Sequence, residues 1–149
     1  MTTRKGRWAP LGIVMGVLAA CGGGGGNAGT SSTGSGGADS GVSLSLSTTA
    51  VAETAGTDQS APTAAFQASA YGLTSGQQVY LSATYSKNGI ASMSAATDSS
   101  PITVSIQFQS PATLGAGVYH DTIKVSECYD QGCTQQVTHS PQTVSVTYT

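Results

Sequence analysis

Apolar and polar residues alternate with a period of two over most of the chain after residue 41, which is the pattern of β-strands with one buried face. The alternating apolar positions form six runs, which are Val42, Leu44 and Leu46; Ala64, Phe66, Ala68 and Ala70; Val79, Leu81, Ala83 and Tyr85; Ile102, Val104, Ile106 and Phe108; Tyr119, Ile123 and Val125; and Val144, Val146 and Tyr148. This part of the chain shows no apolar stripe with the 3.6-residue period of a helix.

Turn-forming residues separate these runs. Four prolines lie at run edges, where a missing N–H costs no ladder hydrogen bond, and they are Pro62, Pro101, Pro111 and Pro141. The pair Asn88-Gly89 comes just before Ile90 and favours a two-residue hairpin, because both residues accept positive φ. Residues 42–149 are therefore expected to form one all-β domain, an antiparallel two-layer sandwich of about seven or eight strands, with a small barrel as the alternative.

The first twenty residues have a different pattern. Basic residues Arg4, Lys5 and Arg7 precede an apolar stretch of 13 residues, Trp8 to Ala20. This stretch is shorter than the roughly 20 residues that a transmembrane helix needs, and a basic start followed by a short apolar run is typical of a secretory signal peptide. Residues 1–20 are therefore expected to be removed on export.

The stretch closes on Leu18-Ala-Ala-Cys21, which resembles the lipobox of bacterial lipoproteins. The resemblance implies cleavage before Cys21 and acylation of its sulfur, with palmitate among the fatty acids, so the partner of this end is a membrane. Gly22 follows the cysteine, and the resemblance implies sorting to the outer membrane of a Gram-negative cell envelope. An ordinary signal peptide with a cysteine after its cleavage site is the alternative.

Residues 21–41 link this cysteine to the alternating region. Half of the twenty residues from 22 to 41 are glycine, and most others are Ser, Thr, Ala or Asn. Without a large apolar side chain such a segment cannot offset its ordering entropy, so we expect a disordered tether with a root-mean-square span of about 25 Å.

Removal of residues 1–20 changes the charge. Lys87 and Lys124 then face seven acidic residues, which gives a net charge of −5. Nucleic acid and bare anionic lipid attract clustered Lys and Arg, so neither is an expected partner.

Three cysteines are present, and lipidation consumes the first. Cys128 and Cys133 remain as an even pair in an oxidising compartment, separated by four residues that include the turn formers Asp130 and Gly132. We expect a disulfide. A metal site that combines both thiolates with His120 or His139 is the alternative, but it offers only three ligands at unsuitable spacing.

Catalytic chemistry has little support in the sequence. His120 and His139 accompany no nucleophile motif, and Asp121 and Glu127 lie about 20 Å apart along one expected strand, too far for a paired-carboxylate site. Glu127 and Asp130 are too few oxygen ligands for calcium. We therefore expect no enzyme, no cofactor and no metal site.

Two further motifs resemble known modules. Leu114-Gly-Ala-Gly117-Val-Tyr119 resembles the tyrosine corner of immunoglobulin-like sandwiches, in which the buried Tyr hydroxyl bonds to the loop backbone. This corner, the pair Cys128 and Cys133, and the closing run 143–148 together are similar to immunoglobulin-like, BACON-like modules of bacterial envelope proteins. The resemblance implies an immunoglobulin-like sandwich over residues 42–149.

The expected function is that of a monomeric, lipid-anchored envelope protein whose β-module binds an envelope protein or a glycan without catalysis. A purely structural envelope lipoprotein is the alternative. Outward-facing tyrosines are the candidate contacts, because aromatic rings stack on sugars and anchor interfaces, and the two selected are Tyr80 on a strand and Tyr129 beside the cysteines. Tyr71 is a third candidate near a turn.

Overall fold

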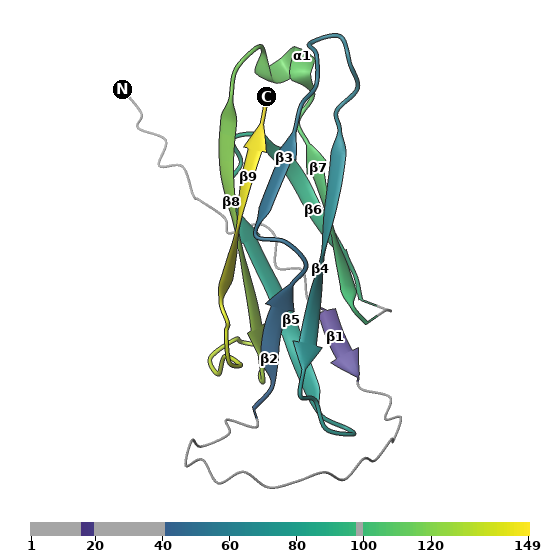
Figure 1. Ribbon diagram of the computed structural model, residues 1–149, viewed down its shortest axis with the longest axis vertical. Coiled ribbons are helices and arrows are strands. Elements are labelled where there is room, and N and C mark those ends of the chain that lie inside the picture. Colours follow the sequence, from purple (N-terminus) through teal and green to yellow (C-terminus); the bar gives the residue numbers. More distant parts are fainter. Residues whose placement is uncertain (1–15, 20–40, 98–99) are drawn as a thin grey trace, which may run out of the picture.

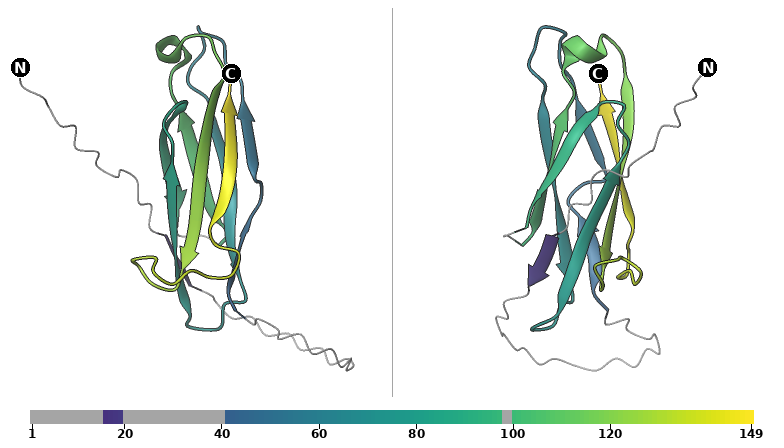
Figure 2. Two further views of the ribbon diagram at one scale, coloured as in Figure 1. Left: turned by 90° about the vertical axis from the view of Figure 1, so that its left-hand side faces the viewer. Right: turned by 180° about the vertical axis from the view of Figure 1, so that it is seen from behind.

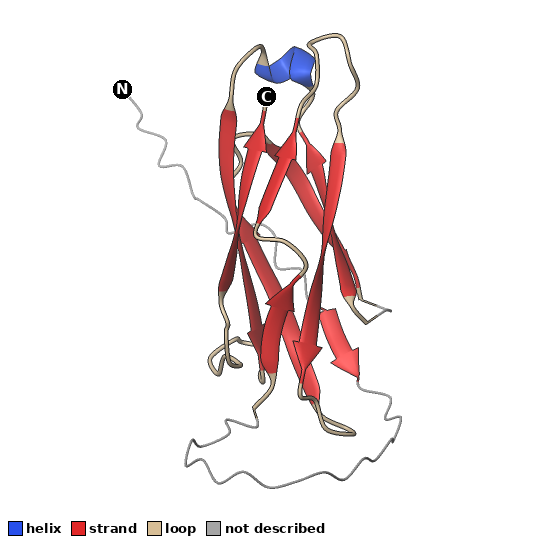
Figure 3. Cartoon of the chain, viewed as in Figure 1, coloured by secondary structure: helices blue, strands red, loops and turns tan. Residues whose placement is uncertain are grey.

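The protein is a sandwich of two β-sheets, as Figures 1 and 3 show. The computed structural model describes residues 16–19, 41–97 and 100–149. The five-stranded sheet has the order β1-β5-β8-β9-β3, and the four-stranded sheet has the order β2-β4-β7-β6. The strands are β1 (Gly16–Ala19), β2 (Ser43–Leu46), β3 (Ala50–Glu53), β4 (Thr63–Tyr71), β5 (Gln78–Tyr85), β6 (Ile90–Ala96), β7 (Ile102–Phe108), β8 (Tyr119–Cys128) and β9 (Gln142–Tyr148).

The alternation in the sequence becomes the two faces of each strand, and this confirms the predicted all-β sandwich. In β7 the residues Ile102, Val104, Ile106 and Phe108 are buried, and the residues between them are exposed or half-buried. Every buried residue of the core cluster lies between Val42 and Tyr148. Among the residues whose burial is described, the segment 42–148 thus contains one continuous core shared by the two sheets.

The predicted hairpin at Asn88-Gly89 is wrong. β5 and β6 lie in different sheets, so the segment 86–89 is a crossover between layers. The reason lies 33 residues further on, in the buried carboxylate of Asp121. It accepts hydrogen bonds from the backbone N–H groups of Asn88 (2.8 Å), Gly89 (2.6 Å) and Ile90 (3.0 Å). These bonds hold the crossover against β8 and prevent the chain from turning back on itself.

The sequence pattern did not predict the strands β1 and β3 or the helix α1 (Pro111–Leu114). β3 pairs in parallel with β9, with Val51 opposite Val146, although the stretch Ala50–Glu53 is too short to show alternation. The helix α1 is a single turn between β7 and β8, and it starts at one of the prolines expected at run edges. Among the described residues, no helix is long and apolar enough to cross a membrane.

Residues 16–19, which belong to the predicted signal peptide, form β1. This strand pairs antiparallel with the outer edge of β5, from Gly16 opposite Leu81 to Ala19 opposite Gln78. Ala20, Cys21 and the tether 22–40 lie outside the described residues.

The sandwich is elongated, and different loops lie at the two ends of its long axis (Figures 1 and 2). The start of β2 and the loops β4–β5 and β8–β9 lie at one end, which we call the tether end because residue 41 enters there. The helix α1 and the end of β9 lie at the opposite end. Each candidate contact can therefore be assigned to one end of the molecule.

Candidate functional site

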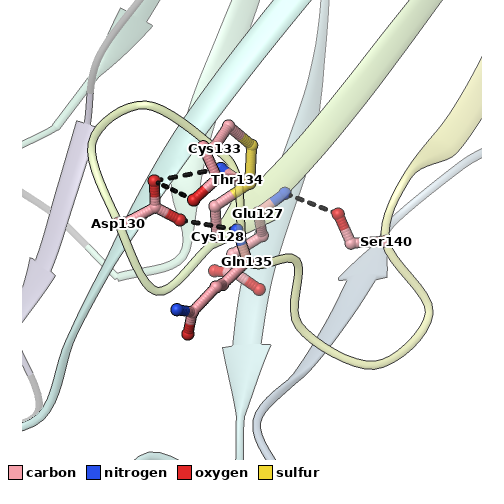
Figure 4. The surroundings of a disulfide bond; sticks show 7 residues. All are labelled: Glu127, Cys128, Asp130, Cys133, Thr134, Gln135 and Ser140. Atoms are coloured by element: carbon pink, nitrogen blue, oxygen red, sulfur yellow. Dashed lines mark hydrogen bonds between the residues drawn. A yellow bond between two sulfur atoms is a disulfide. The ribbon is translucent and has the colours of Figure 1, made fainter.

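The loop between β8 and β9 is closed by a disulfide (Figure 4). Cys128 is the last residue of β8, and its Cα lies 5.1 Å from that of Cys133, to which its sulfur is bonded. This separation is within the usual range for a disulfide. Cys128 is fully buried. Both sulfurs are therefore engaged with each other, which supports the predicted pairing and leaves no thiolate for a metal ion.

The side chain of Asp130 holds the same loop from inside (Figure 4). One carboxylate oxygen accepts hydrogen bonds from the Thr134 N–H and hydroxyl, both at 3.0 Å, and the other accepts the Gln135 N–H at 2.7 Å. The backbone N–H groups of Thr134 and Gln135 lower the pKa of Asp130 below its ordinary value. The loop 128–135 thus has two independent constraints, one covalent and one electrostatic.

Tyr129 lies between these constraints and the start of the domain. Its hydroxyl accepts a hydrogen bond from the Val42 N–H at 3.2 Å, and its own N–H donates to the Gln135 carbonyl at 2.8 Å. The residue is 37 % exposed, so part of its surface faces solvent. Tyr129 therefore has a structural contact as well as an accessible face.

All three candidate tyrosines belong to the tether end. Tyr80 is half-buried and sits directly opposite Cys128 in the β5–β8 pairing, so it shares the outer face of the sheet with the disulfide. Tyr71 ends β4 opposite Ser43 and is 60 % exposed. The sequence predicted outward tyrosines one by one, but their placement at a common end depends on the strand order.

Glu127 is a feature that the sequence analysis missed. Its side chain points into the core from β8, opposite Leu81, and is fully buried. Neither carboxylate oxygen has a hydrogen-bond partner among the described residues. Burial in this apolar environment raises the pKa of Glu127 to about 7. One sequence signal was present. Glu127 lies two residues after Val125, so it falls on the same face of the strand as the inward-facing Asp121, Ile123 and Val125.

The backbone around Glu127 ties the β8–β9 segment together. Its N–H donates to the Ser140 hydroxyl at 2.8 Å (Figure 4), and its carbonyl accepts the Val137 N–H at 3.0 Å. The next residue, Thr138, exchanges backbone hydrogen bonds with β2, from Leu44 N–H to Thr138 and from Thr138 N–H to Val42, both at 3.0 Å. This connection covers the start of the free edge of β2.

The motif around Tyr119 lies at the opposite end. The Tyr119 hydroxyl donates to the Leu114 carbonyl at 2.6 Å and lies 3.3 Å from the Gly115 carbonyl. A Cβ on Gly117 would lie 3.2 Å from the Tyr119 hydroxyl oxygen, which explains the glycine between them. This is the bond from ring to loop backbone that a tyrosine corner requires.

The remaining candidate residues are separate from this loop. His120 and His139 are exposed, and the His120 Nδ1 lies 3.4 Å from the Thr147 hydroxyl. A shallow cavity of about 260 Å³ lies over the four-stranded sheet, lined by Thr63, Ser92, Ser94, Ser105, Ile106 and Gln107. Within the described ranges, no three His, Cys, Asp or Glu side chains are grouped to hold a metal ion.

No family model, curated protein or solved structure matches the chain.

Proposed function

We propose that this chain is a lipid-anchored lipoprotein of the cell envelope whose β-sandwich is a non-catalytic interaction module. The observation that carries the proposal is the tether end, where the disulfide-closed loop carries Tyr129 and Tyr80 lies opposite Cys128, while Tyr71 is exposed at the same end on the other sheet. A loop that is already ordered loses little conformational entropy on binding, and tyrosines supply large contact areas with few rotatable bonds. The partner is an envelope protein or a glycan.

The sandwich is further proposed to be immunoglobulin-like. Its strand order β2-β4-β7-β6 against β5-β8-β9 is consistent with the A-B-E-D and C-F-G sheets of that fold, with β8 as strand F. The bond from Tyr119 at the start of β8 to Leu114 supports the same assignment.

The anchor is proposed from the sequence Leu18-Ala-Ala-Cys21, with the outer membrane as its location. The position of the tyrosines fits this proposal, because the sandwich begins beside them: the Val42 N–H donates to the Tyr129 hydroxyl, and Ser43 lies opposite Tyr71. The tether expected from the composition of residues 21–41, with a span of about 25 Å, would place the tether end close to the membrane surface. The binding surface therefore faces partners that are themselves embedded in, or lie against, the membrane.

The test is a binding screen with the lipid-free protein, residues 21–149 carrying Cys21→Ser. Glycans, peptidoglycan and envelope extract are the ligands, and each positive is repeated with Tyr80→Ala and Tyr129→Ala. Val118→Ala is the matched control, because Val118 is 57 % exposed next to Tyr119 at the opposite end. Tyr129→Phe separates the ring from its hydroxyl bond to Val42.

Loss of binding in the two alanine variants, with binding retained in Val118→Ala, supports the tether end as the interaction surface. Binding that survives both alanine changes contradicts the proposed surface. No binding to any ligand favours a purely structural lipoprotein, in which the Tyr129–Val42 contact only holds the loop.

A further inference from the structure

The strand β5 has an outer edge that already pairs with a second neighbour, β1. Within residues 41–149, β5 pairs only on one side, with β8. Its other side is occupied by β1, which covers Gln78 to Leu81. The edge from Ser82 to Tyr85 extends past the region that β1 covers.

The β5 edge lacks the features with which other edges of this protein resist pairing. β5 spans eight residues without a charge or a proline, QVYLSATY, and its pairing with β8 is in continuous register. In contrast, β6 has an irregular register between Ile90 and Ser92, β3 is short and ends on Glu53, and the start of β2 is covered by Thr138. Bulges, charges and covering segments are the usual means of blocking strand addition.

We propose that in the mature protein the β5 edge binds an extended, uncharged peptide segment of a partner protein, which takes the place of residues 16–19. The inference rests on the proposed function, in which residues 1–20 are removed and the edge is vacated. The segment Gly-Val-Leu-Ala of β1, which pairs with this edge, indicates what kind of peptide binds there, namely one of small and aliphatic residues without charge. Strand addition of this kind takes its affinity from backbone hydrogen bonds and its specificity from alternate side chains.

The surroundings of the edge add a side-chain contact. Tyr80 lies opposite Val17 of β1 on one side and Cys128 on the other, so an added strand passes beside the Tyr80 ring. The disulfide fixes the neighbouring strand β8 at this point. The proposed tether-end surface therefore includes the backbone N–H and C=O groups of the β5 edge as well as the tyrosine side chains.

The test uses a defined probe, a synthetic peptide with the sequence of residues 15–20, MGVLAA, followed by lysines for solubility. The isotope-labelled protein of residues 21–149 with Cys21→Ser is titrated with the probe and followed by amide chemical shifts and hydrogen exchange. Shifts and slower exchange are expected at residues 78–81. A probe methylated on alternate backbone nitrogens carries the same side chains and should bind about tenfold more weakly or not at all, because it cannot complete the ladder.

Two protein comparisons complete the experiment. The full chain, whose edge is occupied by β1, should show no binding. Ser82→Lys places a charge on the edge beside the peptide and should weaken binding, whereas Ser126→Lys places the same charge directly opposite on the inner strand β8 and should not.

Equal binding of the methylated probe, shifts away from β5, or no binding by millimolar peptide concentrations would overturn the proposal. Self-association of residues 21–149 through β5 that the peptide cannot displace would assign the edge to a second copy and would also overturn it. The titration needs neither the lipid nor a natural partner, so its result is independent of whether Cys21 is acylated or the binding screen succeeds.

Discussion

Two carboxylates near the two ends of β8 face the same core but have opposite surroundings. Asp121 accepts three backbone N–H bonds and a bond from the Ser86 hydroxyl at 2.6 Å. Glu127 is buried without a hydrogen-bond partner among the described residues. The hydrogen-bonded carboxylate of Asp121 holds the crossover between β5 and β6 in place. The carboxylate of Glu127 is buried without such bonds, and this burial disfavours its ionised form.

The stability of the protein should therefore decrease as the pH rises toward neutrality. The folded state raises the pKa of Glu127 from 4.5 to about 7. Between these values the folded state retains a proton that the unfolded state has released, so the free energy of unfolding falls by about 3 kcal/mol across this window. Glu127→Gln stays neutral and should remove this slope, which urea unfolding between pH 4 and 8 measures.

The matched control is Asp58→Asn at an exposed carboxylate, which should leave the slope unchanged. Asp130 does not interfere, because its lowered pKa places its titration below the window. A Glu127→Gln protein with the same dependence on pH as the parent would contradict the assignment.

Tyr119→Phe tests the bond to Leu114. The change keeps the ring and deletes one hydroxyl, so the free energy of unfolding should fall by about 1 kcal/mol, or by up to about 3 if the carbonyl is left without a partner. Tyr71→Phe at a 60 % exposed position should have no effect. Equal stability of the Tyr119→Phe protein and the parent in urea would show that the bond contributes nothing.

At the scale of elements, alternation in the sequence predicted the strands well, because each strand has one face in a common core. It did not predict which strands pair. Asn88-Gly89 has the composition of a hairpin, yet the distant Asp121 carboxylate holds it as a crossover. The hydrogen bonds from Asp121 outweigh the local turn propensity of Asn88-Gly89. A short window of sequence cannot reveal an interaction between residues 33 positions apart.

The candidate site was predictable only in its parts. Cys128 and Cys133 followed from their number and spacing. Tyr80 followed from its place on the polar face of an alternating strand, whereas Tyr129 and Tyr71 followed from their places in the cysteine loop and near a turn. The burial of Glu127 was not foreseen, since a charged residue near a loop usually faces solvent. Its position depends on the segment 136–138, which crosses back to pair with β8 and β2.

Removal of the disulfide should loosen the β8–β9 loop without unfolding the sandwich. Cys128→Ser combined with Cys133→Ser opens a small ring, so the chain-entropy model gives a loss of about 2 kcal/mol. The Asp130 bonds to Thr134 and Gln135 remain and keep part of the loop order. Urea unfolding measures the loss.

The bond itself is checked by intact mass. Alkylation of the lipid-free Cys21→Ser protein without reductant should add no alkyl group, and with reductant under denaturing conditions it should add two. Two added groups before reduction would contradict the disulfide.

At the scale of the whole molecule, the anchor is tested by Cys21→Ser in the full chain. This change should abolish incorporation of labelled fatty acid and leave unprocessed precursor, because the acylated sulfur is missing. Cys128→Ser is the matched control and should still incorporate label. The parent should partition with membranes, since two or more acyl chains hold a protein where one does not. Unchanged labelling of Cys21→Ser would refute lipidation.

The parallel pairing of β3 with β9 has a mechanical consequence. The chain enters the sandwich at the tether end, and β9 runs toward the opposite end. A pull between the anchor and the end of β9 therefore acts along the strands and loads the hydrogen bonds between β3 and β9 in shear, so that they share the force instead of breaking one after another. A module anchored at the tether end and pulled at the end of β9 would therefore resist extension as a stiff link.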